Sequence, residues 1–426
     1  MKTKKRALSG ILAGTLAILL TVSALAAQDG FGNFTLSDNY KSGQFNDVDG
    51  TEWYAMYVEN ACNYGFLQGK SANAFDPSGL LTLGEAVTLA ARLMSIYKTG
   101  AADFAESIPF YTAYADYALA NGIISSHGDY GSIASRARFA ELIYKALPSE
   151  AFPEINDVQD YSICDVTPDT GYGAAVYALY RAGVLAGSDR YGTFFPDSSL
   201  TRAEACAIMV RLAAPAVRLR MTLPDQIPAE TIFRRSSSAV FLIETFDVRN
   251  ESIRTGSGFF VSDTGIAVTN LHVLESAASA TVTTPGGDVF PILGVLAISE
   301  KYNLTIISVD SGESPCNYLS IADSDLLEAG STVYAIGSPL SLINTMTEGI
   351  VSNKSRELDG QTFIQFTAPI SFGSGGSPVL NTLGQVIGVA SSSFSYGQNL
   401  NLAVPANFIR ELKPGECIPL KEFLER

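Results

Sequence analysis

The sequence has few histidines, few cysteines and fewer basic than acidic residues. These shortages limit the chemistry and the binding partners that can be expected of it. Only two of the 426 residues are histidines. His127 lies in a polar loop and is interpreted as a solvated turn residue, so His272 is the candidate for chemistry. Lysine and arginine total 28 against 43 acidic residues, a formal net charge of -15. With no basic domain to neutralise phosphates, no nucleic-acid partner is expected.

The five cysteines are scattered, odd in number and without any C-x-x-C spacing, which excludes the usual zinc and redox motifs. No metal and no cofactor is predicted. Cys62 and Cys206 lie within helical patterns and are expected to be buried thiols. A disulfide between Cys316 and Cys417 is permitted in an exported protein, but nothing else in the sequence supports it.

A secretory signal peptide is expected over residues 1–26. A basic stretch, Lys2 to Arg6, precedes an apolar run, Ile11 to Leu25, and an A-x-A cleavage site ends at Ala26. The alternative is a retained membrane anchor, but the run is short for a span and ends in small residues. No later segment reaches the apolar length of a spanning helix, so the mature protein is predicted to be exported and soluble.

Residues 45–214 carry a threefold repeat of helix, loop and helix, of which the middle unit is degenerate. The glycines that end the first helices recur about 60 residues apart, at Gly65, Gly122 and Gly183. The second helices of the outer units begin after threonine, with glutamate three residues later. These pairs, Thr82 with Glu85 and Thr201 with Glu204, are interpreted as capping boxes rather than catalytic groups.

The repeats resemble S-layer homology (SLH) domains. The resemblance rests on Asp-Val openings, an aromatic pair, Phe-x-Pro turns and a Thr-Arg-Ala-Glu signature. These are Asp47-Val48 and Asp157-Val158, Trp53-Tyr54, Phe75-Asp76-Pro77 and Phe195-Pro196-Asp197, and Thr201-Arg202-Ala203-Glu204. It implies a three-unit helical bundle, with repeats at 45–98, 105–148 and 154–214, that binds a secondary polysaccharide of a bacterial cell wall.

In SLH domains the signature arginine lines the binding groove, which suits an anionic sugar polymer. The first unit has Leu83 at that position, so the resemblance carries over only to Arg136 and Arg202. Trp53 is a further candidate for polymer binding, although a packing role is equally expected for it. The implied location is the cell surface, in the cell wall or the S-layer.

The sequence changes in character after a proline-containing linker at residues 215–230. From residue 231 to 426, short segments rich in Val, Ile and Thr alternate with turn signals such as Pro285-Gly286-Gly287 and Asp359-Gly360. This pattern is typical of antiparallel β-barrels. The predicted fold class is therefore multidomain α + β, with an α-helical bundle followed by an antiparallel barrel domain.

The second half resembles trypsin-like serine proteases of the HtrA type. The resemblance rests on GSGFFVSDTGIAVTNLHVL, GSTVYAIGSPLSLINTMTEGIVSN, ISFGSGGSPVLN and NLNLAVPANFIREL, at residues 256–274, 330–353, 370–381 and 399–412. It implies a double β-barrel with a peptide-binding groove beside residues 386–391, with a preference for aliphatic side chains. No PDZ domain is expected, because the chain ends at Arg426.

Acyl transfer by such proteases needs a serine nucleophile, a histidine base, an orienting carboxylate and an oxyanion hole. His272 matches the base. The position of the acid holds Asn303, and an amide cannot stabilise an imidazolium and favours the wrong tautomer. The candidate site therefore lacks its carboxylate.

The position of the nucleophile has two alignments. Without a gap, Gly375 falls at the nucleophile, Gly373 at the oxyanion-hole glycine and Ser374 between them. With Ser377 as an insertion, Ser374 becomes the nucleophile, and Phe372 then occupies a position that favours glycine. The gapless alignment is preferred for that backbone reason.

Three hypotheses follow. The preferred one is a wall-anchored pseudoprotease, whose barrel binds peptides or unfolded proteins without cleaving them. The alternative is an active wall-anchored serine endopeptidase that uses His272 and Ser374. A third possibility is that the helical half carries the function and the barrels act as a spacer.

Overall fold

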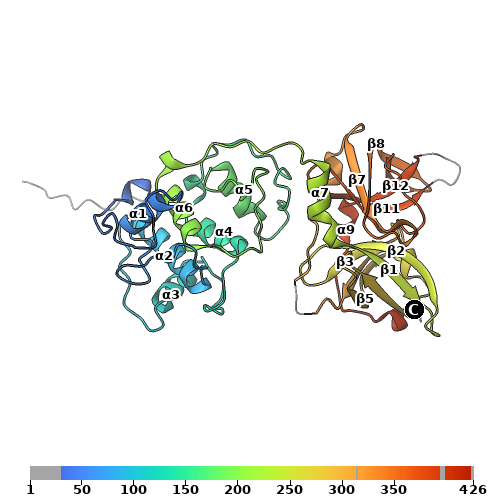
Figure 1. Ribbon diagram of the computed structural model, residues 1–426, viewed down its shortest axis with the longest axis horizontal. Coiled ribbons are helices and arrows are strands. Elements are labelled where there is room, and N and C mark those ends of the chain that lie inside the picture. Colours follow the sequence, from blue (N-terminus) through green and yellow to red (C-terminus); the bar gives the residue numbers. More distant parts are fainter. Residues whose placement is uncertain (1–29, 313–314, 394–398, 424–426) are drawn as a thin grey trace, which may run out of the picture.

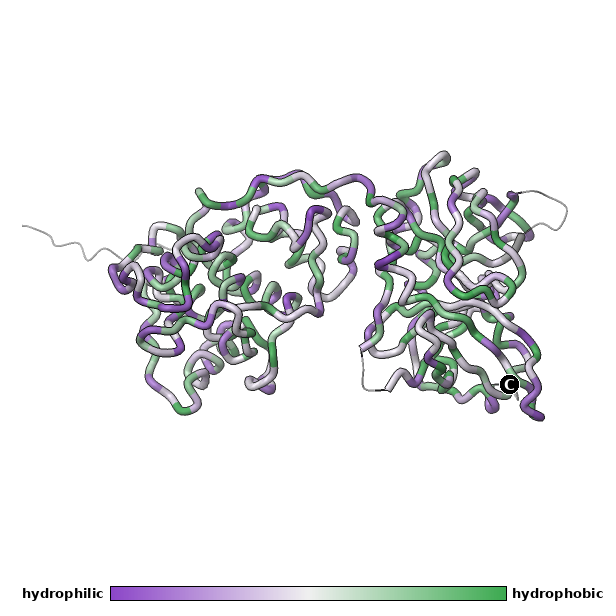
Figure 2. The backbone as a smooth tube through the Cα atoms, viewed as in Figure 1, coloured by the Kyte–Doolittle hydropathy of each residue, from purple (hydrophilic) through white to green (hydrophobic). Residues whose placement is uncertain are grey.

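A computed structural model describes residues 30–312, 315–393 and 399–423 of the chain. The chain folds into a helical half and a half made of two β-barrels (Figure 1). The expected signal peptide, residues 1–26, lies outside the described residues. Apolar stretches run through the interior of both halves (Figure 2). None of the helices in the described ranges combines the length and hydrophobicity that a membrane crossing needs.

The helical half contains three pairs of helices. They are α1 (Ala55–Asn63) and α2 (Leu83–Thr99), α3 (Thr112–Ala120) and α4 (Arg136–Lys145), and α5 (Gly173–Arg181) and α6 (Arg202–Ala213). Gly65, Gly122 and Gly183 follow α1, α3 and α5 with φ of 76°, 73° and 69°, the left-handed conformation that ends a helix. Both predicted capping boxes are confirmed, since the threonine and glutamate side chains at the starts of α2 and α6 each accept the other residue's backbone N–H.

The three helix pairs meet through the short segments that precede their second helices. Isolated β-bridges join Leu80 to Thr201, Thr82 to Ile133, and Ser135 to Ser199, so each unit contacts both others. Around this junction a single hydrophobic core extends from Phe34 to Leu223. One unit could not bury its apolar face alone, and the closed arrangement of three removes that surface from water.

Two motif assignments in the third repeat need correction: the aspartate of its opening, and its Phe-x-Pro turn, which is Phe194-Phe195-Pro196 and not Phe195-Pro196-Asp197. Asp47 accepts the backbone N–H groups of Phe75 and Asp76 at 2.8 and 2.7 Å. In the third repeat Asp165, not Asp157, makes the same pair of bonds, to the N–H groups that begin the Phe-x-Pro turn, 194–196. Asp157 accepts only a local bond from the Gln159 amide. The string around Asp157 resembles the first opening, but the chain places the equivalent aspartate eight positions later.

Each barrel is a closed, antiparallel, six-stranded sheet, which confirms the predicted double barrel. The first barrel has the order β1-β2-β3-β6-β5-β4 and the second β10-β11-β12-β9-β8-β7. The strands of the first are β1 (Val240–Phe246), β2 (Ser252–Phe260), β3 (Ile266–Asn270), β4 (Ser279–Thr283), β5 (Val289–Ser299) and β6 (Leu304–Val309). Those of the second are β7 (Thr332–Gly337), β8 (Thr345–Leu358), β9 (Gln361–Phe366), β10 (Pro378–Leu380), β11 (Val386–Ser393) and β12 (Asn401–Pro405).

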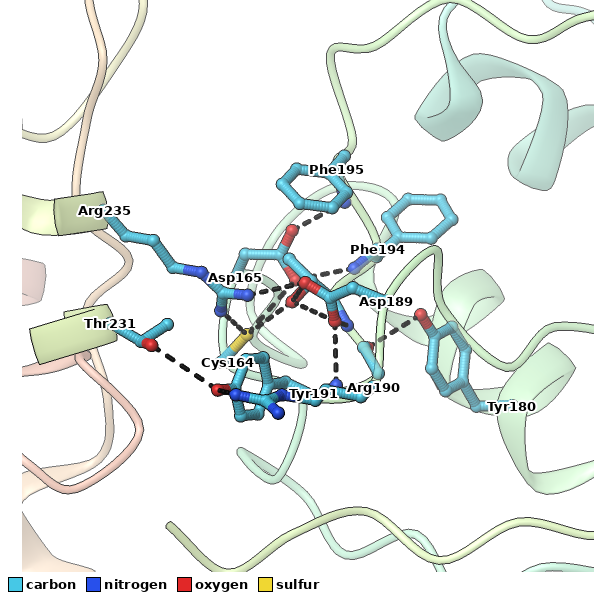
Figure 3. A network of polar contacts seen from close by, with 12 residues as sticks. Cys164, Asp165, Tyr180, Asp189, Arg190, Tyr191, Phe194, Phe195, Thr231 and Arg235 are labelled. Carbon is cyan, nitrogen blue, oxygen red and sulfur yellow. Dashed lines mark hydrogen bonds and ion pairs between the residues drawn. The ribbon is translucent and has the colours of Figure 1, made fainter. Parts of the chain in front are cut away.

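The third repeat docks on the barrels beside α7 (Ala229–Ser236), which lies at the boundary of the two halves (Figure 1). Arg235 of α7 donates to Asp189 at 2.6 Å and covers the Tyr191 ring (Figure 3). Cys164 is part of a hydrophobic cluster built mainly from barrel residues. We call this contact between the third repeat and the barrels the seam. Both halves contribute residues to it. The predicted linker crosses it, with Leu219 bonded to Gly183 of the helical half and Ile227 to Thr382 of the second barrel.

All five cysteines are free thiols, so no disulfide joins Cys316 and Cys417. Cys62 and Cys206 are buried in the helical core, as predicted. Burial raises the pKa of Cys62 to about 11 and that of Cys206 well above its usual value. Both thiols therefore remain protonated at neutral pH.

Candidate active site and polymer groove

His272 and Asn303 are brought together by the pairing of two strands. β3 ends at Asn270, which pairs with Leu304 at the start of β6. The next residues along β3, the short helix α8 (Leu271–Leu274), therefore lie beside Asn303. The Asn303 side chain accepts the backbone N–H of His272 through Oδ1 at 2.9 Å, and its Nδ2 lies 2.7 Å from His272 Nδ1.

These two contacts determine the tautomer of His272. Oδ1 of Asn303 must face the backbone N–H, because an amide nitrogen cannot accept that bond. Nδ2 therefore points its N–H at Nδ1, and Nδ1 must be the unprotonated ring nitrogen. Burial lowers the pKa of His272, so the ring is neutral at pH 7. Its single proton is thus on Nε2, the nitrogen that a general base needs free.

Gly375 lies opposite Nε2 of His272. A methyl group added to Gly375 would stand 3.1 Å from Nε2 and 3.4 Å from Asn270 Oδ1. Gly373 and Gly376 have left-handed φ of 89° and 87°, whereas Gly375 does not, so its backbone could carry a side chain. A side chain at position 375 would therefore reach His272, and glycine has only a hydrogen atom there.

Ser374 turns away from this arrangement. Its side chain is buried, and Oγ accepts the N–H of Ser371 at 3.2 Å. Among the described contacts it makes no hydrogen bond to His272. Ser377 is likewise buried, against Gly337 of β7. The structure thus brings His272, Asn303 and Gly375 together and leaves out Ser374 and Ser377.

Ser257 of β2 fixes the backbone of the loop that carries Gly373 and Gly375. It donates its N–H to the Gly375 carbonyl and its hydroxyl to the Gly373 carbonyl, each at 2.8 Å. These bonds hold both carbonyls inward. In the described part of the chain no acceptor takes up the N–H of Gly373 or Gly375, whereas the N–H of Ser374 is bonded to Ser371.

Asn270 and Ser257 were not identified from the sequence. Asn270 donates Nδ2 to the Asn303 carbonyl at 3.1 Å, and its Oδ1 is buried without a partner beside Gly375. Ser257 stands in the motif Gly256-Ser257-Gly258, where the glycines are more conspicuous than the serine. Both residues lie in quoted motifs, but their roles depend on contacts with distant segments.

The helical half has a cavity of about 770 Å³ beside the signature arginine of the third repeat. Arg202 is buried, donates to the Phe75 and Gln68 carbonyls at 3.0 and 2.7 Å, and pairs with Glu85 at 3.0 Å. Lys70 pairs with the same carboxylate at 2.7 Å. Arg202 thus contributes from the third repeat to a groove that is otherwise lined by the first repeat and by residues 104–114.

The other two predicted polymer-binding residues do not line this cavity. Arg136 occupies the corresponding place at the start of α4, where it donates to the Phe194 carbonyl at 2.7 Å and lies 3.7 Å from Glu204. The space beside it is closed by apolar side chains, including Phe139 and Leu185. Trp53 is 58% exposed and packs edge-on against Tyr54.

Comparisons with known proteins agree with this architecture. The family model described as "Trypsin-like peptidase domain" matches residues 256–389, and "S-layer homology domain" matches residues 44–87 and 165–206. The chain therefore carries SLH domains and a trypsin-like peptidase domain. The second SLH match begins at Asp165, the residue whose hydrogen bonds repeat those of Asp47.

The curated relatives are HtrA and DegP serine proteases. The chain is 40% identical over 149 residues to a probable periplasmic DegP-like serine endoprotease of Chlamydia pneumoniae, covering 34% of this chain and 30% of that protein. It is 37% identical over 158 residues to the putative serine protease HhoB of Synechocystis, covering 35% and 37%. With bovine mitochondrial serine protease HTRA2 it shares 33% over 192 residues, covering 42% and 41%.

The chain thus spans well under half the length of these relatives. A solved structure, the HtrA-type protease AlgWS227A with tripeptide, matches 43% of this chain and 62% of that one, at 26% identity and a TM-score of 0.40.

Proposed function

We propose that this protein is an exported, wall-anchored pseudoprotease, whose barrels bind peptides or unfolded protein segments without cleaving them. The observation that carries the proposal is Gly375 facing His272 Nε2, where acyl transfer needs a hydroxyl group. The alternative, an active endopeptidase, would have to use Ser374, whose hydroxyl bonds within its own loop.

The remaining parts of the centre support binding more than hydrolysis. Asn303 leaves the proton of His272 on Nε2, so the ring presents a donor and no base. The N–H groups of Gly373 and Gly375, the predicted oxyanion hole, need no catalytic partner in order to hold a carbonyl oxygen. The centre has thus kept its binding groups and lacks the groups that transfer protons and form the acyl bond.

A free strand edge supports peptide binding. β10 pairs with residues between Val386 and Val389 of β11, so among the described strands Ser392 and Ser393 pair with β12 alone. An extended peptide can add to such an edge through main-chain hydrogen bonds. This edge begins next to the loop that carries Gly375, because Ala390, earlier in β11, is hydrogen-bonded to Gly376 and Ser377.

The SLH domains support attachment to a cell-wall polysaccharide, and hence a location in the cell wall or S-layer. The cavity at Arg202 carries both cationic and anionic side chains with polar backbone groups at its walls. Such a mixture suits a sugar polymer bearing some negative charge. We assign polymer binding to this cavity, with Arg202 as its positioning group.

Labelling with a serine-directed fluorophosphonate, together with casein hydrolysis, tests the proposal. The parent protein and its Ser374→Ala variant should both stay unlabelled and inactive. Asn303→Asp with Gly375→Ser should create labelling and cleavage, because the pair restores the hydroxyl and the base tautomer. Gly375→Ser alone should be about 10⁴-fold slower than the pair, since Asn303 still holds the wrong tautomer.

Casein cleavage by the parent that Ser374→Ala abolishes would overturn the proposal in favour of the active endopeptidase. The new serine fits with a small shift, because its Cβ would lie 3.1 Å from Nε2.

A further inference from the structure

The space that a side chain at position 375 would occupy is bordered by two polar atoms. His272 Nε2 and Asn270 Oδ1 would lie 3.1 and 3.4 Å from a β-carbon added to Gly375. Gly375 and His272 are both partly exposed, whereas the Asn270 side chain is fully buried. We therefore expect this space to be open to a bound molecule on one side and to end at the buried amide.

The two polar atoms differ in hydrogen-bonding character. Asn270 donates Nδ2 to the Asn303 carbonyl at 3.1 Å, so its amide orientation is fixed and Oδ1 is the acceptor. In the described part of the chain this buried Oδ1 has no hydrogen-bond partner. His272 Nε2 carries the single ring proton, because Asn303 Nδ2 faces Nδ1. The space thus offers one donor and one acceptor.

This combination discriminates between ligand groups. A carboxylate would be repelled by Oδ1, and an ammonium group by the Nε2–H. An apolar group would leave the buried Oδ1 without a hydrogen bond, which is costly. A primary amide carries its donor and its acceptor on two separate atoms, whereas both atoms of the protein lie within 3.4 Å of one point. A hydroxyl oxygen accepts and donates at a single atom, so it fits this space best.

Water has the same hydrogen-bonding character and is the competing occupant. A hydroxyl group of a bound peptide can displace that water without losing either hydrogen bond, whereas a methyl group cannot. The strand edge proposed for peptide binding begins next to the loop of Gly375, since Ala390 is hydrogen-bonded to Gly376 and Ser377. A peptide on this edge is therefore close enough to direct one of its side chains at the space.

The surface around the space is apolar. Phe372 is 91% exposed, and Leu340 and Leu342, on the neighbouring loop, are 69% and 63% exposed. The two loops are joined by the bond from the Leu340 N–H to the Phe372 carbonyl at 2.8 Å. Exposed apolar side chains beside a few polar groups are typical of a ligand site. We therefore expect apolar residues on either side of the hydroxyl group.

From these contacts we infer that the space beside Gly375 binds the side-chain hydroxyl group of a serine or threonine, presented by a peptide that is otherwise apolar. The inference rests on the proposed function and narrows its ligand from peptides in general to hydroxyl-bearing ones. The missing side chain of this protein is thus replaced by one from its ligand.

The test exchanges one hydroxyl group for a methyl group in a peptide. Each residue of the Val and Ala segment in fluorescein-Gly-Gly-Val-Ala-Val-Ala-Val-amide is replaced in turn by serine or by its isostere α-aminobutyrate. Binding to the unaltered full chain is measured by fluorescence anisotropy. For at least one position the serine peptide should bind about tenfold more tightly, because the methyl group leaves Oδ1 and Nε2–H without a partner.

Two further measurements locate the hydroxyl group. Gly375→Ala should abolish the preference, because its methyl group fills the space beside Nε2. Gly286→Ala is the matched control, since it adds a methyl group in an exposed turn with no atom closer than 3.5 Å, and it should keep the preference. In ¹⁵N-histidine-labelled parent protein, the Nε2 signal of His272 should differ between the serine and α-aminobutyrate complexes, a readout that needs no variant to fold.

The outcomes separate this inference from the proposed function. Equal affinity of both peptides at every position would mean that water keeps the space, and would overturn the inference while leaving the pseudoprotease proposal intact. So would a preference for serine that leaves the Nε2 signal unchanged, because the hydroxyl group would then bind elsewhere. Binding of no peptide at all, or cleavage of the peptides, would overturn the proposed function as well.

Discussion

The side-chain amide of Asn303 contacts both the backbone N–H and the ring nitrogen Nδ1 of His272. Together these two contacts determine the tautomer of the His272 ring. The backbone N–H of His272 needs an acceptor, so Oδ1 is engaged, and Nδ2 is left to face the ring at 2.7 Å. An imidazolium would place two N–H groups against each other at that distance. The exchange of one carboxylate oxygen for NH₂ thus changes the ring from a base into a donor.

The tautomer can be measured directly, because the chain has only two histidines. In ¹⁵N-histidine-labelled protein at pH 7.5, the neutral ring of His272 should carry its proton on Nε2. Asn303→Asp should move the proton to Nδ1 and raise the pKa of the ring, because a carboxylate accepts Nδ1–H and stabilises the imidazolium. A His127→Asn variant assigns the signals. A proton on Nδ1 in the parent would show that the Asn303 amide is turned the other way.

At the scale of secondary-structure elements, α4 and α6 begin with arginines in nearly the same setting. Each guanidinium donates to the carbonyl of a Phe-x-Pro turn in a neighbouring repeat and lies over that phenylalanine ring, at 5.3 Å for Arg136 and 4.7 Å for Arg202. The difference lies in the space beside them, which is open at Arg202 and closed at Arg136. The two helix starts therefore share a structural role, and polymer binding is proposed for one of them.

This difference predicts the effect of two matched substitutions on sedimentation with purified wall sacculi. Arg202→Ala should weaken binding by about 1.5–3 kcal/mol, the cost of losing a charged hydrogen bond at the polymer. Arg136→Ala should leave binding unchanged, although it removes a residue of equal burial. Circular dichroism should show both variants folded. An equal loss in the two variants would mean that the effect is structural, and the cavity would lose its assignment.

At the scale of the whole molecule, the seam between the third repeat and the barrels combines apolar and charged contacts. Arg235 pairs with Asp189 at 2.6 Å and Arg410 with Asp169 at 3.0 Å, while Cys164 is buried in the cluster below them. Arg235 and Asp189 are both partly buried, so their pairing is less screened than that of an exposed ion pair, whereas Asp169 is exposed. These contacts hold the barrels in one orientation relative to the helical half.

Removing both seam arginines should loosen this arrangement. In the variant Arg235→Ala with Arg410→Ala, trypsin should cut the linker at the exposed Arg220 several-fold faster, because the seam no longer keeps the two ends of the linker together. The control variant Arg249→Ala removes an arginine from an exposed turn of the barrel. Trypsin should cut its linker at the parental rate. Unchanged cleavage in the double variant would show that the apolar contacts alone hold the seam.

The architecture was predictable from the sequence because its signals are local. Capping boxes, helix-ending glycines and apolar alternation act within a few residues, and they identified the helix pairs and the barrels. The barrel motifs also predicted that His272 and Asn303 would meet, since the pairing of β3 with β6 is part of that framework. Asp157 shows the limit of such signals. The residues around it are similar to those around Asp47, but the hydrogen bonds that define the motif are made by Asp165.

Only the tertiary structure decides which residue faces His272. The loop around Gly375 has no periodicity, so a one-residue gap leaves no local trace, and the contact with Nε2 arises between segments about a hundred residues apart. The same holds for the tautomer of His272, which depends on the backbone N–H that Asn303 accepts. Residue type and spacing determined the fold and the inventory of groups, whereas donor directions, open space and the seam arise from contacts that no single segment contains.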